Sequence, residues 1–93
     1  MAQPYYPSSD MSFEQFVHRL RSLWRVEIPA GVNPYASLFE DLGSDSMQAF
    51  ELLIIIEGLA DCMVPPMEVP EMYTLADTFD YFKLLREIAL AES

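Results

Sequence analysis

The sequence predicts an all-α fold: a small bundle of three main helices with a fourth, short one. Three observations favour it. Apolar residues recur at helical spacing in three separate segments. A pair of capping residues stands at the start of each of these segments. No segment shows the sustained apolar–polar alternation, with β-branched side chains, that is typical of strands.

The first helix is expected over residues 12–25. Ser12 and Gln15 form a capping-box pair, and Met11 with Phe16 is placed to form a hydrophobic staple around it. The expected inner stripe consists of Phe13, Phe16, Val17, Leu20, Leu23 and Trp24. The expected outer face carries His18, Arg19, Arg21 and Arg25.

Two segments around this helix are expected to be irregular. Residues 1–11 are expected to form a flexible leader, because their first nine positions include two prolines and two serines. The folded domain is then expected over residues 12–93. Residues 26–44 predict a long loop, because two prolines and a glycine break regular structure there. We expect this loop to be anchored to the core by Leu38, Phe39 and Leu42.

The second helix is expected from Ser46 to Ala60, with Asp45 as its N-cap and Gln48 closing the capping box. The run Leu52–Ile56 resembles a strand, but the capped start and the continuing helical period favour a helix. Its inner side is expected to carry Ala49, Leu52, Leu53, Ile56 and Leu59. The opposite side mixes apolar and acidic residues, namely Met47, Glu51, Ile54 and Gly58. Apolar residues on an outer face indicate a docking surface.

The last third of the chain predicts an irregular segment and then a helix. Prolines make residues 61–73 irregular, with room for one short helical turn around Met67–Met72. The last helix opens at Thr74, with Asp77 three residues on. Its expected inner stripe consists of Leu75, Phe79, Phe82, Leu85 and Ala89.

The charge of the chain is strongly and unevenly acidic. Fifteen acidic residues oppose five basic ones, for a formal net charge of −10. Between Val26 and Phe82 there are eleven acidic residues and no basic residue. This argues against binding to nucleic acid or to an anionic membrane surface, both of which require basic residues. We expect partner proteins with basic docking patches instead.

Several other classes of function find no support in the sequence. No apolar run reaches the length of about 20 residues that spans a bilayer. The lack of a signal-peptide pattern and the single Cys62 predict a cytoplasmic protein. Neither His18 nor Cys62 has metal-ligand spacing, and no calcium-loop pattern occurs, so no metal site is expected. No nucleophile–base–orienter set is apparent, so we expect no catalytic residues and no enzyme.

The most informative segment runs from Leu38 to Met47 and places a serine at the first turn of the second helix. Ser46 is expected to point outward, after a flexible Gly-Ser approach. A phosphate attached to it would lie near the free N–H groups and the positive end of the helix dipole. Taken alone, Ser46 is better explained as a capping serine with no further role.

The extended motif resembles the acyl carrier protein family, whose members are small four-helix bundles that carry a phosphopantetheine arm. The family pattern F-x-D-L-G-x-D-S-[LM] is present from Phe39 to Met47. Further matches follow at compatible spacing: Glu51, Ile54, Glu57, Val64-Pro65, Thr74-Leu75 and Phe79 to Phe82. The resemblance covers about residues 12–85. It implies an all-α bundle of acyl-carrier type.

The resemblance implies a role for each matching residue. Ser46 takes the position to which 4′-phosphopantetheine is esterified, which would make the chain a phosphoprotein, and Asp45 is the residue that precedes this serine in the acyl branch. The partner-binding positions are Met47, in place of the usual Leu, together with Glu51, Ile54 and Glu57. The implied partners are a phosphopantetheinyl transferase and acyltransferase, adenylating or ketosynthase-type enzymes, which a monomeric carrier would visit in turn.

The resemblance leaves the cargo open. The second helix ends with fewer acidic residues than in fatty-acid carriers. Together with the leader over residues 1–11, this favours a carrier of secondary metabolism, of polyketide or nonribosomal peptide type. One alternative is an aminoacyl carrier fed by an adenylating enzyme. Another is an acidic helical adapter that carries nothing and docks through Met47 and Ile54, with Ser46 unmodified.

Overall fold

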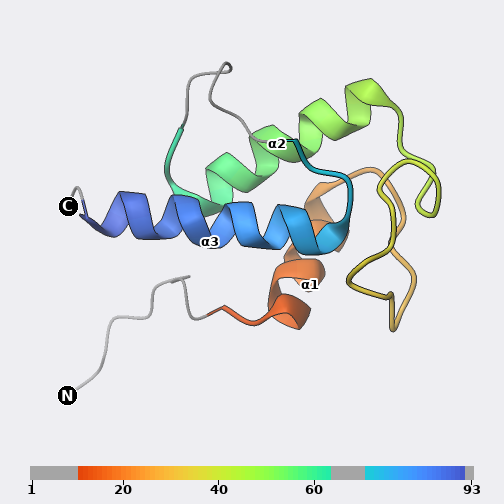
Figure 1. Ribbon diagram of the computed structural model, residues 1–93, viewed down its shortest axis with the longest axis horizontal. Coiled ribbons are helices and arrows are strands. Elements are labelled where there is room, and N and C mark those ends of the chain that lie inside the picture. The colour runs from red at the N-terminus through yellow and green to blue at the C-terminus, as the bar shows by residue number, and fades with distance from the viewer. Residues whose placement is uncertain (1–10, 64–70, 92–93) are drawn as a thin grey trace.

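The computed structural model describes residues 11–63 and 71–91, and in this part of the chain the fold is all-α. The helices are α1 (Phe13–Leu23), α2 (Ser46–Ala60) and α3 (Leu75–Ala91). Helices α2 and α3 lie side by side and run in roughly the same direction, with α1 packed below them in the view of Figure 1. The prediction of an all-α fold with three main helices is confirmed.

Parts of two predictions fall outside the described residues. The short helical turn expected around Met67–Met72 lies mostly within residues 64–70, which are not described, and Glu71 and Met72 are not helical. Of the predicted leader, only Met11 is described. It is buried against the core together with Phe16, as a hydrophobic staple requires.

Helix α1 begins as predicted and ends earlier than predicted. Ser12 and Gln15 make both bonds of the capping box, at 3.1 and 2.9 Å. The helix ends at Leu23 rather than at residue 25, because Trp24 adopts an extended backbone conformation as the C-cap. Leu23 is consequently exposed, contrary to prediction, and the Trp24 side chain takes the buried position at this end of the helix.

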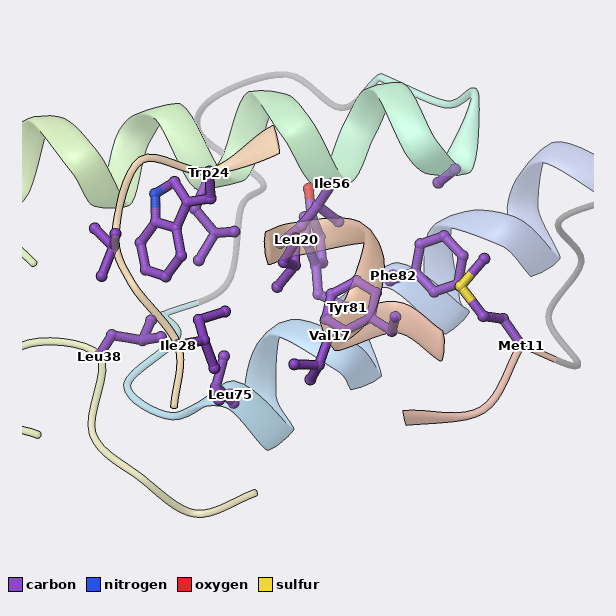
Figure 2. Close-up of a cluster of buried hydrophobic side chains, with 14 of the residues drawn as sticks. Met11, Val17, Leu20, Trp24, Ile28, Leu38, Ile56, Leu75, Tyr81 and Phe82 are labelled. Atoms are coloured by element: carbon purple, nitrogen blue, oxygen red, sulfur yellow. The ribbon is translucent and has the colours of Figure 1, made fainter. Parts of the chain in front are cut away.

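The core joins all three helices and the loop between α1 and α2. Aromatic rings form its centre, where Phe16 packs against Phe79 and Phe82 with ring centroids 5.3 Å apart in both pairs. Figure 2 shows how side chains from α1, α2, α3 and the loop meet in this core. Its buried members include Val17, Leu20, Trp24, Ile28, Leu38, Leu52, Ile56, Leu75, Tyr81, Phe82 and Leu85.

The long loop is held by both side chains and backbone. Leu38 is buried and Leu42 packs against the core, as predicted. Phe39 is exposed, which corrects the prediction that it anchors the loop: a turn follows Leu38, so the two neighbouring side chains point in different directions. An isolated antiparallel bridge pairs Ser37 with Thr74, and thereby ties the loop to the start of α3.

Candidate functional site

The chain enters α2 through a turn that its sequence specifies locally. Gly43 has a φ of +73°, a left-handed conformation that glycine adopts without strain. Asp45 is the N-cap, and its carboxylate accepts the N–H of Gln48 at 2.8 Å. The Gln48 side chain accepts the Asp45 N–H at 3.0 Å in return, so the predicted capping box is complete.

Two serines in this turn have opposite environments. Ser44 is buried, and its hydroxyl donates a hydrogen bond of 2.7 Å to the carbonyl of Leu38. Ser46 is the first residue of α2 and is exposed. Within residues 11–63 and 71–91, the Ser46 hydroxyl makes no hydrogen bond. Ser44 therefore has a structural role, whereas the Ser46 hydroxyl is free to react.

The first turn of α2 is fixed from the side by α1. The indole Nε1 of Trp24 donates a hydrogen bond of 2.8 Å to the carbonyl of Gln48. Trp24 itself is buried in the core. The position of Ser46 is therefore determined by the core of the bundle as well as by the loop that precedes it.

The surroundings of Ser46 fit a phosphate ester. The first turn of α2 contains no acidic residue. A phosphate on the Ser46 oxygen would lie at the positive end of the helix dipole, beside backbone N–H groups. The Asp45 carboxylate opposes this by its charge, but its capping bond directs it toward the Gln48 N–H.

The outer face of α2 is an apolar stripe formed by Met47, Phe50 and Ile54. These side chains are 66%, 58% and 53% exposed, respectively. The prediction for Met47 and Ile54 as exposed residues is confirmed. Phe50 was not predicted, although its place three residues after Met47 and four before Ile54 puts it on the same face by helical spacing.

Glu51 is not an unpaired carboxylate of this face, although the sequence has no basic residue between Val26 and Phe82. It is half-buried, and its Oε2 lies 2.6 Å from Nη2 of Arg25. Arg25 follows the end of α1 and is distant from Glu51 in sequence. The fold therefore brings a basic side chain to a helix whose own sequence contains none. The ion pair neutralises the charge of Glu51 at the edge of the apolar stripe.

Glu57, the last of the predicted partner-binding residues, is not exposed on the outer face of α2. Only 8% of it is exposed. Burial raises the pKa of the Tyr81 hydroxyl on α3, and the charges of Glu57 and Cys62 add to this shift. With Glu51 paired and Glu57 buried, α2 itself presents no unpaired exposed carboxylate to solvent.

A cleft of about 470 Å³ opens at the C-terminal end of α2. It is lined by Ile54, Glu57, Gly58, Asp61, Cys62 and Met63. Ile54 belongs both to this cleft and to the apolar stripe, so the two features are continuous. The sequence did not predict the cleft, because it depends on the left-handed C-cap at Asp61, where the chain turns away from the helix.

The described residues lack two other features. No group of three or more His, Cys, Asp or Glu side chains is placed there to hold a metal ion. None of the three described helices is sufficiently long and apolar to cross a membrane.

The sequence is similar to an acyl carrier protein from Syntrophobacter fumaroxidans (strain DSM 10017 / MPOB), with 34% identity over 50 residues. The match covers 54% of this chain and 62% of that protein. The chain thus spans less than two thirds of the length of this relative. No protein-family model matches the sequence. No solved structure matches it significantly.

Proposed function

We propose that this chain is an acyl carrier protein with 4′-phosphopantetheine attached to Ser46. The observation that carries the proposal is the exposed, unbonded Ser46 hydroxyl at the start of a capped helix. The helical fold and the similarity to an acyl carrier protein support it. Asp45 contributes by fixing the backbone on which Ser46 stands.

The modification follows from the chemistry of a free hydroxyl. In a Mg²⁺-dependent step on a phosphopantetheinyl transferase, Ser46 Oγ attacks the phosphorus of coenzyme A that bears pantetheine. The new P–O bond replaces the pyrophosphate P–O bond, and adenosine 3′,5′-bisphosphate leaves with the electron pair. The serine proton goes to a base of the transferase.

The protein then acts as a carrier, and the reactions on its cargo take place in partner enzymes. The thiol at the end of the arm holds an acyl or aminoacyl group as a thioester. The chain supplies a rigid attachment point, because Trp24 and the capping box fix the first turn of α2. The favoured role is that of a monomeric, cytoplasmic carrier in secondary metabolism of polyketide type, with an aminoacyl carrier as the alternative.

The structure modifies the expected mode of partner recognition. The partner surface would meet Met47, Phe50 and Ile54, whose exposure favours an apolar contact. The exposed carboxylates of Asp45 and Asp61 flank the two ends of α2. Basic patches on a transferase, acyltransferase, adenylating or ketosynthase-type enzyme would therefore contact the ends of the helix and contribute mainly to the rate of encounter.

Labelling tests the attachment site. The chain is incubated with Mg²⁺, a broad-specificity phosphopantetheinyl transferase and coenzyme A that bears a fluorophore on its thiol. We expect in-gel fluorescence from the wild type and from Ser44→Ala, and none from Ser46→Ala. Labelling that persists in Ser46→Ala contradicts the proposed site, and an unlabelled but folded wild type favours the adapter.

Loading assays separate the two kinds of carrier. The modified chain is offered malonyl donors with an acyltransferase, or amino acids with ATP and an adenylating enzyme. A thioester formed only from the malonyl donor supports the polyketide type. A thioester formed only from an amino acid supports the aminoacyl alternative.

A further inference from the structure

Arg25 brings a positive charge to the side of α2. Its Nη2 donates a hydrogen bond of 2.6 Å to Oε2 of Glu51, and the Arg25 side chain makes no other hydrogen bond within the described part of the chain. The Arg25 side chain is 72% exposed, whereas that of Glu51 is 31% exposed. The carboxylate is thus largely covered, while the guanidinium, which has five N–H donors, keeps most of them for another partner.

The backbone fixes the direction in which Arg25 points. The chain leaves α1 in an extended conformation at Trp24, and burial alternates from there. Trp24, Val26 and Ile28 are buried. Arg25 and Glu27, which lie between them, are exposed. The Trp24 indole also donates a hydrogen bond to α2, against which it lies in Figure 2. Arg25 is therefore held beside α2 by buried neighbours, with its side chain outward.

Arg25 stands at the edge of the apolar stripe. Glu51 follows Met47 by four residues and precedes Ile54 by three, so helical spacing places it along the same face. The guanidinium that pairs with Glu51 is consequently at this face too. Because α2 itself presents no unpaired exposed carboxylate, the charge that Arg25 adds here is positive, in a chain whose formal net charge is −10.

This charge would act on any protein that docks on the stripe. A basic side chain of the partner is repelled by Arg25, and it could reach the Glu51 carboxylate only by displacing Arg25. A carboxylate of the partner, by contrast, can accept hydrogen bonds from the guanidinium N–H groups that Glu51 leaves free.

We propose that Arg25 determines which partners dock on α2. It favours a partner whose apolar docking surface carries an aspartate or glutamate opposite Arg25, and it disfavours one with a lysine or arginine there. This inference rests on the proposed carrier function and specifies the partner that fits the apolar stripe. It is compatible with basic patches at the two ends of α2, because the pair of Arg25 with Glu51 lies between these ends.

Modification by matched enzyme variants tests the proposal. A broad-specificity phosphopantetheinyl transferase is prepared unaltered and as single variants, in which each lysine or arginine of its carrier-docking surface is replaced by glutamate. With each transferase, kcat and KM are measured for the wild-type chain, Arg25→Glu and Arg19→Glu. Arg19 is an exposed arginine of α1, so Arg19→Glu has the same net charge as Arg25→Glu and is the matched control.

The expected result is a reversal of preference that is specific to position 25. With the unaltered transferase, Arg25→Glu should be modified about fivefold more efficiently than the wild type, mainly through a lower KM, as the strongest exposed ion pairs allow. With at least one glutamate-bearing transferase, the wild type should be the better substrate. Arg19→Glu should show no reversal, and Arg25→Lys, which keeps the charge, should follow the wild type.

A milder variant keeps the test decisive if Arg25→Glu does not fold. Arg25→Gln places no like charge beside Glu51 and should show the same reversal in smaller measure. A merely structural ion pair would lower stability without making the preference depend on the charge of the transferase.

The outcomes distinguish this inference from the proposed function. If the Arg25 and Arg19 variants behave alike with every transferase, on chains that take up the arm, the inference about the partner is overturned and the carrier function stands. A folded wild type that takes up no arm from any of the transferases overturns the carrier function, and the inference about the partner with it.

Discussion

The two ends of α2 differ in how their functional groups are built. At the N-terminal end, Ser46 is exposed and its surroundings come from neighbours in sequence, Gly43 to Gln48. At the C-terminal end, the polar groups are buried and come from different elements: Glu57 from α2, and Tyr81 and Arg86 from α3.

This difference separates an accessible hydroxyl, which neighbours in sequence position, from buried polar groups, which only packing between helices brings together. A nucleophile that another enzyme modifies must be accessible, and a capped helix start provides this with a few residues. The following variants test this contrast between the two ends.

The largest effect on stability is expected in the middle of α2, because the core packed against this part supports both ends of the helix. Leu52 is buried and Leu52→Ala should lower the free energy of unfolding by about 2–5 kcal/mol, because it leaves a cavity. Urea denaturation followed by circular dichroism measures this. The matched control is Ile54→Ala on the exposed face, which should change stability by no more than about 0.5 kcal/mol. Similar losses from both variants would contradict the assigned faces.

A smaller effect is expected at the N-terminal end. Asp45→Ala removes the acceptor of the Gln48 N–H and should cost about 1 kcal/mol in unfolding free energy. Asp45→Asn keeps a capping oxygen and should lose only part of this stability. If Asp45→Ala were as stable as the wild type, the capping box would not be what orders the turn before Ser46.

At the C-terminal end, removal of a polar group should not destabilise the protein. Tyr81→Phe should leave stability at pH 7 unchanged or raise it by up to about 1 kcal/mol, since the hydroxyl lost is buried and unpaired. Guanidinium denaturation at pH 7 measures the difference. A loss above about 1 kcal/mol would show that the hydroxyl forms a hydrogen bond.

The same variant has a pH signature. Burial raises the pKa of Tyr81 in the folded state above its ordinary value of 10.0. Below pH 10 the hydroxyl is protonated in both the folded and the unfolded chain, and this group costs no stability. As the pH rises from 10 through the folded-state pKa, the unfolded chain ionises first, so the folded state loses stability. Tyr81→Phe should therefore show a weaker decline in stability above pH 10. An identical decline in both proteins would contradict the burial of the hydroxyl.

A small loss is expected at the ion pair between the two ends. Arg25→Ala should cost about 0.2–1 kcal/mol at low salt, because Arg25 is mostly exposed and surface pairs contribute little. The cost should shrink at high salt, where the pair is screened. Thermal unfolding at two ionic strengths measures both. A larger loss that salt does not reduce would indicate a structural role beyond the pair.

The sequence predicted the local features of this molecule well. The capping boxes at Ser12 and Asp45 and both bounds of α2 follow from hydrogen bonds within a few residues, which sequence spacing reveals. The exposure of Met47 and Ile54 follows from helical periodicity in the same way. The accessible serine could therefore be predicted without knowledge of the packing.

The features that depend on packing between elements could not be predicted. The partner of Glu51 is Arg25, 26 residues away, and no local pattern links them. Glu57 is acidic and yet buried, which neither its residue type nor the helical period indicates. Tyr81 and Arg86 acquire their unpaired atoms only when α3 docks on the end of α2.

The intact mass of the chain tests the central claim most directly. After incubation with coenzyme A, Mg²⁺ and a broad-specificity phosphopantetheinyl transferase, the wild type and Ser44→Ala should each gain the mass of one phosphopantetheine. Ser46→Ala should gain none while its circular dichroism spectrum stays helical. A folded wild type with no gain in mass, or a gain that persists in Ser46→Ala, would contradict the account of Ser46 as the attachment site.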